Sequence, residues 1–242
     1  MNEVTIILPT YNEAQNIGEI ISQLRLAVPK AKILVIDDNS LDGTAWIAER
    51  RGCTVIRRSH EKGLSSAVIE GLRHTTEEKV VVMDADLQHP PEAVPELLRR
   101  LDTCDVVIGS RYCPNGKIEG WRVNRRIVSR VANFLAWPLA SRVADRTSGF
   151  FALRRCSAPP LHLLGARGFK ILLEILVKGN GNVVGEVPIT FKCRKAGESK
   201  FKGKQAREYL VQLAGLASYK LQYTWRSNLL RRIREMEEQC EK

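Results

Sequence analysis

Two carboxylates follow a short apolar run near the middle of the chain. Residues 80–83 are Val-Val-Val-Met, and Asp84, Asp86 and Gln88 come after them. Such a run predicts a buried parallel strand, and ligands of open α/β sheets bind beyond the carboxyl ends of these strands. Alternation along an extended chain would point Asp84 and Asp86 to opposite sides. Hard oxygen ligands at this place suit Mg²⁺ or Mn²⁺ that is shared with substrate phosphates.

An acidic turn without a ligand is the alternative interpretation of this stretch. The next residues are His89, Pro90 and Pro91, so no lysine or arginine stands beside the two acids. Uncompensated acids crowded together favour the cation site over the plain turn. Pro91 is suited to the first turn of a helix, which we expect to extend over residues 91–101.

Polar clusters also follow the two earlier strands that we expect. Tyr11 and Glu13 come after residues 4–8, and Asp37 and Asp38 come after residues 33–36. Any one of these clusters could be a helix cap, and Asp38 or Ser40 alone would fit that role. Three clusters at one sheet edge are better explained by a nucleotide site. Neither G-x-G-x-x-G nor G-x-x-x-x-G-K-[ST] occurs, which disfavours dinucleotide redox chemistry and P-loop chemistry.

The elements that position these clusters follow a regular rhythm. Apolar runs at 4–8, 33–36, 54–56, 80–83 and 106–108 alternate with segments of helical periodicity. This alternation predicts an α/β fold, a Rossmann-like doubly wound and mostly parallel sheet. Further on, a polar turn at 145–151 feeds a strand, a helix ends near Gly179, and residues 183–191 form another strand.

The net charge of +11 is unevenly distributed. Residues 1–110 carry 12 basic and 17 acidic side chains, whereas residues 111–242 carry 26 basic and 10 acidic ones. The first part therefore suits a cation and the second part suits anions. Nucleic acid, anionic lipid headgroups and a phosphorylated substrate are all candidates. The six cysteines include no C-x-x-C pair and indicate free thiols in a reducing compartment.

An amphipathic segment lies within the basic part of the chain. Between Arg111 and Arg146 there are eight basic and two acidic residues, interleaved with an apolar face. Such a helix could lie in a membrane surface or pack on the sheet as an ordinary amphipathic helix, and Pro138 would kink or end it. A second helix is predicted from Gln205 to Lys242, placed on lipid, on a partner or on the core. No signal peptide is visible, and no run approaches the roughly 20 apolar residues that a membrane-spanning helix needs.

Five motifs, in order along the chain, resemble those of the family 2 inverting glycosyltransferases of GT-A fold. They are Pro9-Thr-Tyr-Asn-Glu13, Asp37-Asp-Asn-Ser40, the long string from Asp84 to Glu92, Gly109-Ser-Arg-Tyr112, and Arg194-x-x-Gly-x-Ser-Lys200. Within that family the chain is most similar to the dolichyl-phosphate (polyprenyl-phosphate) mannose synthase branch. The resemblance implies a GT-A domain over residues 1–203 and a C-terminal amphipathic helical tail over residues 204–242. The chain differs from the family pattern at Ser65, where relatives commonly carry glycine.

The resemblance also implies substrates and site residues. The donor would be GDP-mannose, the acceptor a dolichyl or polyprenyl monophosphate, and the cofactor Mg²⁺ or Mn²⁺. Asp86 and Arg111 would be catalytic, and Asp86 and Gln88 would bind the metal. Arg111, Arg125 and Ser129 would receive the acceptor phosphate. The donor would be held by Pro9, Tyr11, Glu13, Ile36, Asp38, Asp84, Ala85, Arg194 and Lys200. The enzyme would be peripheral, at the cytoplasmic face of a membrane, and small membrane-anchoring subunits are compatible with this arrangement.

Three rival interpretations remain. The same fold could transfer another sugar, such as glucose from UDP-glucose, to a polyprenyl phosphate. A basic nucleic-acid-binding module is a second class, but strand-end acids would repel a nucleic-acid backbone. A non-catalytic membrane adaptor is a third, although the complete set of acidic and basic motif residues speaks against loss of activity.

Overall fold

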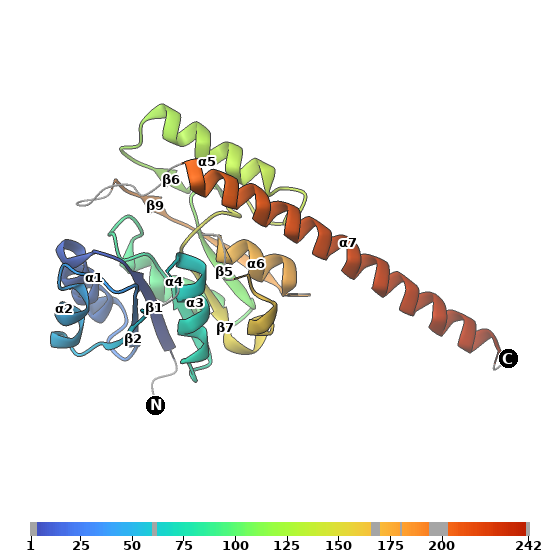
Figure 1. The fold of residues 1–242 in the computed structure, drawn as a ribbon, viewed down its shortest axis with the longest axis horizontal. Helices are drawn as coiled ribbons and strands as arrows, with labels where there is room; N and C mark the ends of the chain where they lie inside the picture. Colours follow the sequence, from blue (N-terminus) through green and yellow to red (C-terminus); the bar gives the residue numbers. More distant parts are fainter. Residues whose placement is uncertain (1–3, 60–61, 166–169, 180, 194–202, 241–242) are drawn as a thin grey trace.

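A seven-stranded sheet forms the centre of the protein (Figure 1). The computed structural model describes residues 4–59, 62–165, 170–179, 181–193 and 203–240. The strand order is β3-β2-β1-β4-β7-β5-β8. The strands are β1 (Val4–Thr10), β2 (Lys32–Asp37), β3 (Thr54–Arg57), β4 (Lys79–Val82), β5 (Val106–Ser110), β7 (Phe151–Arg154) and β8 (Val184–Pro188).

The sheet is mostly parallel, as predicted, with one antiparallel strand. Neighbours on both sides of β1 are parallel, and β5 pairs in parallel with β8. By contrast, β7 is inserted antiparallel between β4 and β5. This insertion brings the turn before β7, at residues 145–150, to the edge where β4 and β5 end. A small second sheet pairs β6 (Lys117–Ile118) with β9 (Thr190–Phe191).

Helices cover both faces of the sheet. One face is covered by α1 (Ala14–Ala27), α2 (Thr44–Arg50) and α4 (Val94–Arg100), and the other by α3 (Leu64–Arg73) and α6 (Ile171–Lys178). Alternation along β1 supplies both cores, because Ile6 packs in the first and Ile7 in the second. The doubly wound α/β prediction is therefore confirmed.

Two expected elements differ from the observed ones. The helix expected over residues 91–101 begins as a 3-10 turn, η1 (Pro91–Ala93), before α4. Pro90 and Pro91 stand together at the start of this turn, and neither donates a backbone hydrogen bond. The strand expected over residues 183–191 is divided at Ile189, whose N–H donates to the Ser110 carbonyl at 3.0 Å. Two shorter 3-10 turns, η2 (Arg155–Ser157) and η3 (Leu161–Leu163), follow β7.

Helix α5 (Val123–Leu135) lies on the outside of the protein and contains no buried residue. Its large apolar side chains are 44–73% exposed, so it is not packed on the sheet by this side. We call these residues the α5 apolar face: Ile127, Val128, Val131, Phe134 and Leu135. The helix ends before Pro138, as expected.

Helix α7 (Gly203–Cys240) packs on the domain at its beginning and extends beyond it (Figure 1). Tyr209 and Leu216 form a small core with Ala136 and Leu173. The Tyr209 hydroxyl donates to the Ala132 carbonyl at 2.7 Å, which ties α7 to α5. Among the described residues, none of the helices is both long and apolar enough to cross a membrane. The described cysteines at 53, 104, 113, 156 and 193 are free thiols.

Candidate functional site

The ends of β1 and β2 are joined by the Asp37 carboxylate. Thr10 Oγ1 donates to Asp37 Oδ1 at 2.8 Å, and the Ser40 N–H donates to Oδ2 at 2.8 Å. Ser40 Oγ in turn accepts from the Asn12 N–H at 2.8 Å. Asn12 and Asn39 have positive φ values of 54° and 59°, a conformation that asparagine tolerates in turns. Asp37 and Ser40 thus shape the edge, and neither caps α2, which begins after Gly43.

Asp38 is held by a network with Arg58 and the start of α3. Arg58 Nε donates to Asp38 Oδ1 at 2.8 Å, and the Gly63 N–H donates to Oδ2 at 2.8 Å. Arg58 Nη1 also donates to Ser66 Oγ at 2.9 Å. Asp38 is therefore a fixed carboxylate at the β2 end, which suits an acceptor for the hydroxyl or N–H groups of a nucleoside.

The other residues of the first two strands that were expected to bind the nucleotide-sugar donor differ in their exposure to solvent. Tyr11 is 38% exposed, and the Lys62 ammonium lies 5.0 Å from its ring centroid. Glu13 accepts from Asn16 Nδ2 at 2.8 Å at the start of α1. Pro9 is buried in β1, and the side chain of Ile36, the residue before the last one of β2, is fully buried in the core.

The Asp84–Gln88 loop begins directly after β4. The Asp84 side chain is 33% exposed, whereas Asp86 is 3% exposed and Ala85 is buried. Leu87 has a φ of 59°, which a branched side chain adopts at a cost of about 1–3 kcal/mol. The turn at Leu87 sets the directions of Asp86 and Gln88. The Gln88 N–H donates to Asp86 Oδ1 at 3.1 Å.

Asp86 and Gln88 form a donor set that fits a divalent cation. Gln88 Nε2 donates to the Lys192 carbonyl at 2.9 Å, which fixes the amide, and Oε1 accepts a long hydrogen bond from Arg125 Nη2 at 3.4 Å that a bound cation would replace. A carboxylate and an amide oxygen are hard ligands, and Mg²⁺ or Mn²⁺ would complete its shell with phosphate oxygens and water. No cluster of three or more His, Cys, Asp or Glu side chains suited to a metal occurs in the described part of the chain. A cation shared with a substrate therefore fits better than a cage made by the protein alone.

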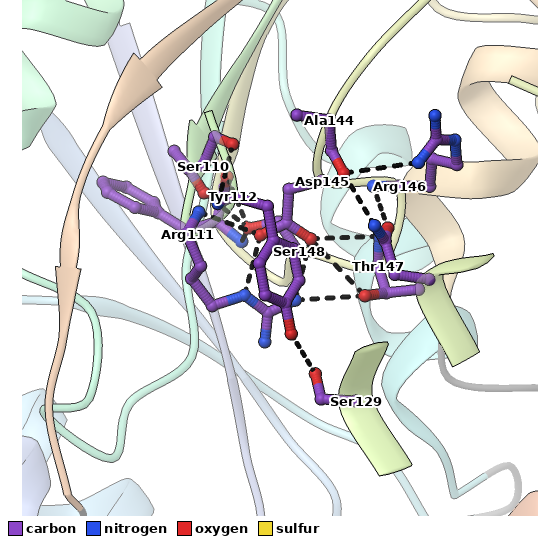
Figure 2. Close-up of polar contacts among 12 residues, drawn as sticks. Ser110, Arg111, Tyr112, Ser129, Ala144, Asp145, Arg146, Thr147 and Ser148 are labelled. Carbon is purple, nitrogen blue, oxygen red and sulfur yellow. Dashed lines mark hydrogen bonds and ion pairs between the residues drawn. The ribbon is translucent and has the colours of Figure 1, made fainter. Parts of the chain in front are cut away.

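Arg111 is buried at the end of β5 and paired with Asp145 (Figure 2). Arg111 Nε and Nη2 donate to the two Asp145 oxygens at 2.7 and 2.8 Å, and Nη2 also donates to Thr147 Oγ1 at 3.0 Å. Burial opposes both charges, yet the partnership lowers the pKa of Asp145 and raises the pKa of Arg111. Most of the Arg111 donors therefore serve Asp145 and Thr147, and its role at an acceptor phosphate stays a prediction.

Arg125 and Ser129 lie on α5, and each contacts a residue that follows a strand end. The Tyr112 hydroxyl donates to Ser129 Oγ at 2.8 Å (Figure 2). Arg125 Nη2 donates to Gln88 Oε1 at 3.4 Å, and its guanidinium carbon lies 3.9 Å from the Trp121 ring centroid. Ser129 is therefore linked through Tyr112 to the residue next to Arg111. Arg125 is linked to the acidic loop through Gln88.

Three charged residues of this region were not predicted from the sequence: Arg58, Asp145 and Lys170. Burial, reinforced by the Arg111 charge, lowers the pKa of Lys170 to about 8, and Lys170 Nζ donates to the Thr147 carbonyl at 2.7 Å. Asp145 stood out as one of two acids in a basic stretch, which was its only signal. Arg194 and Lys200, expected to close over phosphates, lie outside the described residues.

Solved structures with the same architecture define the class of fold. The chain superimposes on glucosyl-3-phosphoglycerate synthase from Mycobacterium tuberculosis in complex with Mg²⁺ and uridine-diphosphate, with a TM-score of 0.69. The two chains are 20% identical, and the match covers 89% of this chain and 79% of that one. The same enzyme in complex with Mn²⁺, UDP-glucose and phosphoglyceric acid gives a TM-score of 0.67. The fold is therefore GT-A, as expected.

Sequence comparison identifies the family. The profile described as Glycosyl transferase family 2 matches residues 5–158. The chain is 43% identical over 228 residues to a dolichol-phosphate mannosyltransferase of Pyrococcus furiosus, covering 90% of this chain but 64% of that protein. It is 37% identical over 239 residues to the Saccharomyces cerevisiae dolichol-phosphate mannosyltransferase, and the match covers 90% of this chain and 88% of the yeast protein. An undecaprenyl-phosphate mannosyltransferase of Micrococcus luteus is 36% identical, and the match covers 89% of this chain and 95% of that protein. The chain belongs to glycosyl transferase family 2.

Proposed function

We propose that this protein transfers mannose from GDP-mannose to a dolichyl or other polyprenyl monophosphate, with inversion at the anomeric carbon. The observation that carries the proposal is the identity of 36–43%, over most of the chain, to mannosyltransferases named for dolichol or undecaprenyl phosphate. The site adds chemical support, since fixed acids and fixed arginines lie at one sheet edge. In this proposal residues 1–203 are the GT-A domain and residues 204–242 are a tail, most of which is α7 (Gly203–Cys240).

The nucleotide lies against the ends of β1 and β2 in this proposal. Tyr11 and Glu13 hold the guanosine end together with Pro9, and Asp38 accepts a hydrogen bond from the nucleoside. Asp84 and Ala85 contact the sugar and the diphosphate, and Arg194 and Lys200 contact the phosphates. Asp86 and Gln88 would hold Mg²⁺ or Mn²⁺, which supplies charge stabilisation for the leaving diphosphate.

The acceptor phosphate is the nucleophile in this mechanism. Its second pKa is about 6, so it is largely ionised at neutral pH and needs no strong general base. The task of the protein is to hold two anionic groups close together in line, and Arg111, Arg125 and Ser129 supply donors for one of them. The bond from the anomeric carbon to the phosphate oxygen of GDP breaks as the bond to the acceptor oxygen forms, and the electron pair leaves with GDP.

A transfer assay tests donor, acceptor and metal together. Radiolabelled GDP-mannose and UDP-glucose are offered in parallel to a polyprenyl monophosphate in detergent, with Mg²⁺ or Mn²⁺ and with EDTA as the control. We expect chloroform-extractable label from GDP-mannose that EDTA abolishes. Label from UDP-glucose alone would replace the donor, and label that persists in EDTA would remove the metal from the proposal.

A substitution at the acidic loop tests the metal ligands. Asp86→Asn keeps the size of the side chain but removes its charge, so we expect transfer to fall by roughly 100-fold or more. Binding of Mn²⁺ in the presence of GDP, followed by calorimetry, should weaken as well. Normal Mn²⁺ binding by the variant would show that Asp86 is not a ligand.

The protein acts at the cytoplasmic face of a membrane as a peripheral enzyme, because its acceptor is anchored there. The α5 apolar face, flanked by exposed arginines, suits contact with anionic lipid. Small membrane-anchoring subunits are compatible with this placement.

A further inference from the structure

Arg111 has a fixed orientation that leaves one edge of its guanidinium group for a ligand. Nε and Nη2 are used by Asp145 and Thr147. The rings of Tyr112 and Phe191 lie 5.2 and 5.4 Å from the guanidinium carbon. Nη1 forms no hydrogen bond with any residue that the structure describes, so its two protons remain for a ligand.

Ser129 receives a defined role from Tyr112. A phenol is a stronger acid than an aliphatic hydroxyl and is therefore the better donor, in agreement with the 2.8 Å bond from the Tyr112 hydroxyl to Ser129 Oγ. Because Ser129 Oγ accepts the hydrogen bond from Tyr112, the Ser129 hydroxyl can donate its own hydrogen bond to a third group. A hydroxyl that would otherwise rotate freely becomes an oriented donor.

Asp145 is itself held in place from two sides. The Glu186 carboxylate of β8 accepts from the N–H groups of Ala144 and Asp145, at 2.7 and 3.1 Å. On the other side, Asn133 of α5 accepts from the Arg146 N–H at 2.8 Å and donates to the Ala144 carbonyl at 2.7 Å. Arg125 and Ser129 lie on that same helix. The Asp145 loop therefore fixes the position of α5 relative to the end of β5.

We propose that Tyr112 and Asp145 are positioning residues that pre-organise the phosphate subsite of the lipid acceptor. This inference rests on the proposed function, in which Arg111, Arg125 and Ser129 receive that phosphate. Neither Tyr112 nor Asp145 touches the phosphate. Asp145 fixes Arg111 so that Nη1 faces the anion, and Tyr112 orients the Ser129 proton toward it. The ordering of these donors is complete before the acceptor arrives, which favours acceptor binding and in-line attack.

Tyr112→Phe is the first test, because it removes one hydroxyl and leaves the ring. Initial rates are measured against polyprenyl monophosphate at saturating GDP-mannose, and binding of the same lipid phosphate to the GDP- and Mg²⁺-loaded protein is measured by calorimetry. We expect the acceptor KM and Kd to rise by roughly 3- to 10-fold, the effect of one oriented hydrogen bond. The GDP Kd should stay unchanged. Tyr219→Phe is the matched control, since no hydrogen bond of its hydroxyl is found among the described residues, and it should behave as wild type.

Asp145→Asn and Thr147→Val test the other half of the subsite. Asp145→Asn should raise the acceptor KM by about tenfold or more, because the charge that fixes Arg111 is lost. Thr147→Val removes a single acceptor from Nη2 and should fold even if Asp145→Asn does not; we expect a rise of about 2- to 5-fold. An unchanged acceptor Kd in Tyr112→Phe and Thr147→Val would overturn the inference, as would equal losses of GDP and acceptor binding. If the wild type binds the lipid phosphate but transfers no mannose, the proposed function fails while the binding comparison still decides the role of both residues.

Discussion

The Asp84 carboxylate lies close to Gly149, and the absence of a side chain on this glycine leaves room for it. A Cβ atom on Gly149 would lie 2.8 Å from Asp84 Oδ2, well inside van der Waals contact. Gly149→Ala should therefore displace the carboxylate and lower kcat/KM for the donor by roughly 10- to 100-fold. Steady-state kinetics at varied donor concentration measures the effect.

Gly215→Ala is the control for that substitution. Gly215 lies in α7, and a Cβ atom there meets nothing within 4 Å. We expect wild-type kinetics and slightly higher stability, since alanine favours a helix by about 1 kcal/mol relative to glycine. Wild-type donor kinetics in Gly149→Ala as well would show that Asp84 does not need its observed position.

Lys170 links the site to the pH dependence of stability. Burial lowers its pKa to about 8 in the folded protein, against about 10.4 in an unfolded chain. Between these values the unfolded state binds more protons, so the free energy of unfolding should rise with pH from about 8 to 10, by up to about 1.4 kcal/mol per unit. Lys170→Met should flatten this rise in urea titrations, whereas Lys30→Met, at an exposed position, should not. An equal slope in wild type and Lys170→Met would contradict the assignment.

At the scale of elements, the start of α3 contains a matched pair of serines. Ser65 is fully buried, and its hydroxyl has no hydrogen-bond partner among the described residues. Its neighbour Ser66 accepts from Arg58 and donates to the Gly63 carbonyl at 2.9 Å.

We therefore expect opposite effects from two alanine substitutions. Ser65→Ala should raise the free energy of unfolding by about 1 kcal/mol, since it removes an unsatisfied buried hydroxyl and favours the helix. Ser66→Ala should lower it by about 1 kcal/mol, because Arg58 loses an acceptor. Chemical denaturation measures both. A loss of stability in Ser65→Ala would mean that the hydroxyl has a partner, such as a bound water.

The elements that could be predicted are those that local patterns specify. The apolar runs of β1, β2 and β4 and the residues at their ends were identified because burial and alternation leave a local trace. The antiparallel insertion of β7 was not predicted, since strand pairing depends on contacts between residues far apart in the chain. For the same reason Asp145 was missed: 34 residues separate it from Arg111, and only the inserted strand brings them together. Arg111 was predicted for its charge, but its burial was not.

At the scale of the whole molecule, basic charge and exposed apolar side chains are concentrated in the same part of the chain. The half of the chain from residue 111 onward carries the excess of basic residues, and α5 presents both arginines and apolar side chains. The first 110 residues carry the excess of acids, and in the proposed function they hold the nucleotide and the cation. This division suits an enzyme that joins a water-soluble donor to a lipid-anchored acceptor, because each substrate meets the half that complements it.

The α5 apolar face is the surface that we expect to contact the membrane. Ile127 and Phe134 are 56% and 73% exposed, and burying such side chains in a bilayer interface contributes about 1.5–3 kcal/mol each. Ile127→Ser combined with Phe134→Ser should therefore lower partitioning onto phosphatidylserine-containing vesicles by tenfold or more, at about 1.4 kcal/mol per factor of ten. Flotation measures this partitioning, and Leu26→Ser, which changes an 83% exposed leucine on α1, serves as the control.

Higher salt should weaken wild-type binding to the vesicles, because the exposed arginines at 122, 126 and 130 contribute to it. If the double variant floats like the wild type, α5 is not the membrane contact, and the exposed apolar residues of α7 become the next surface to change.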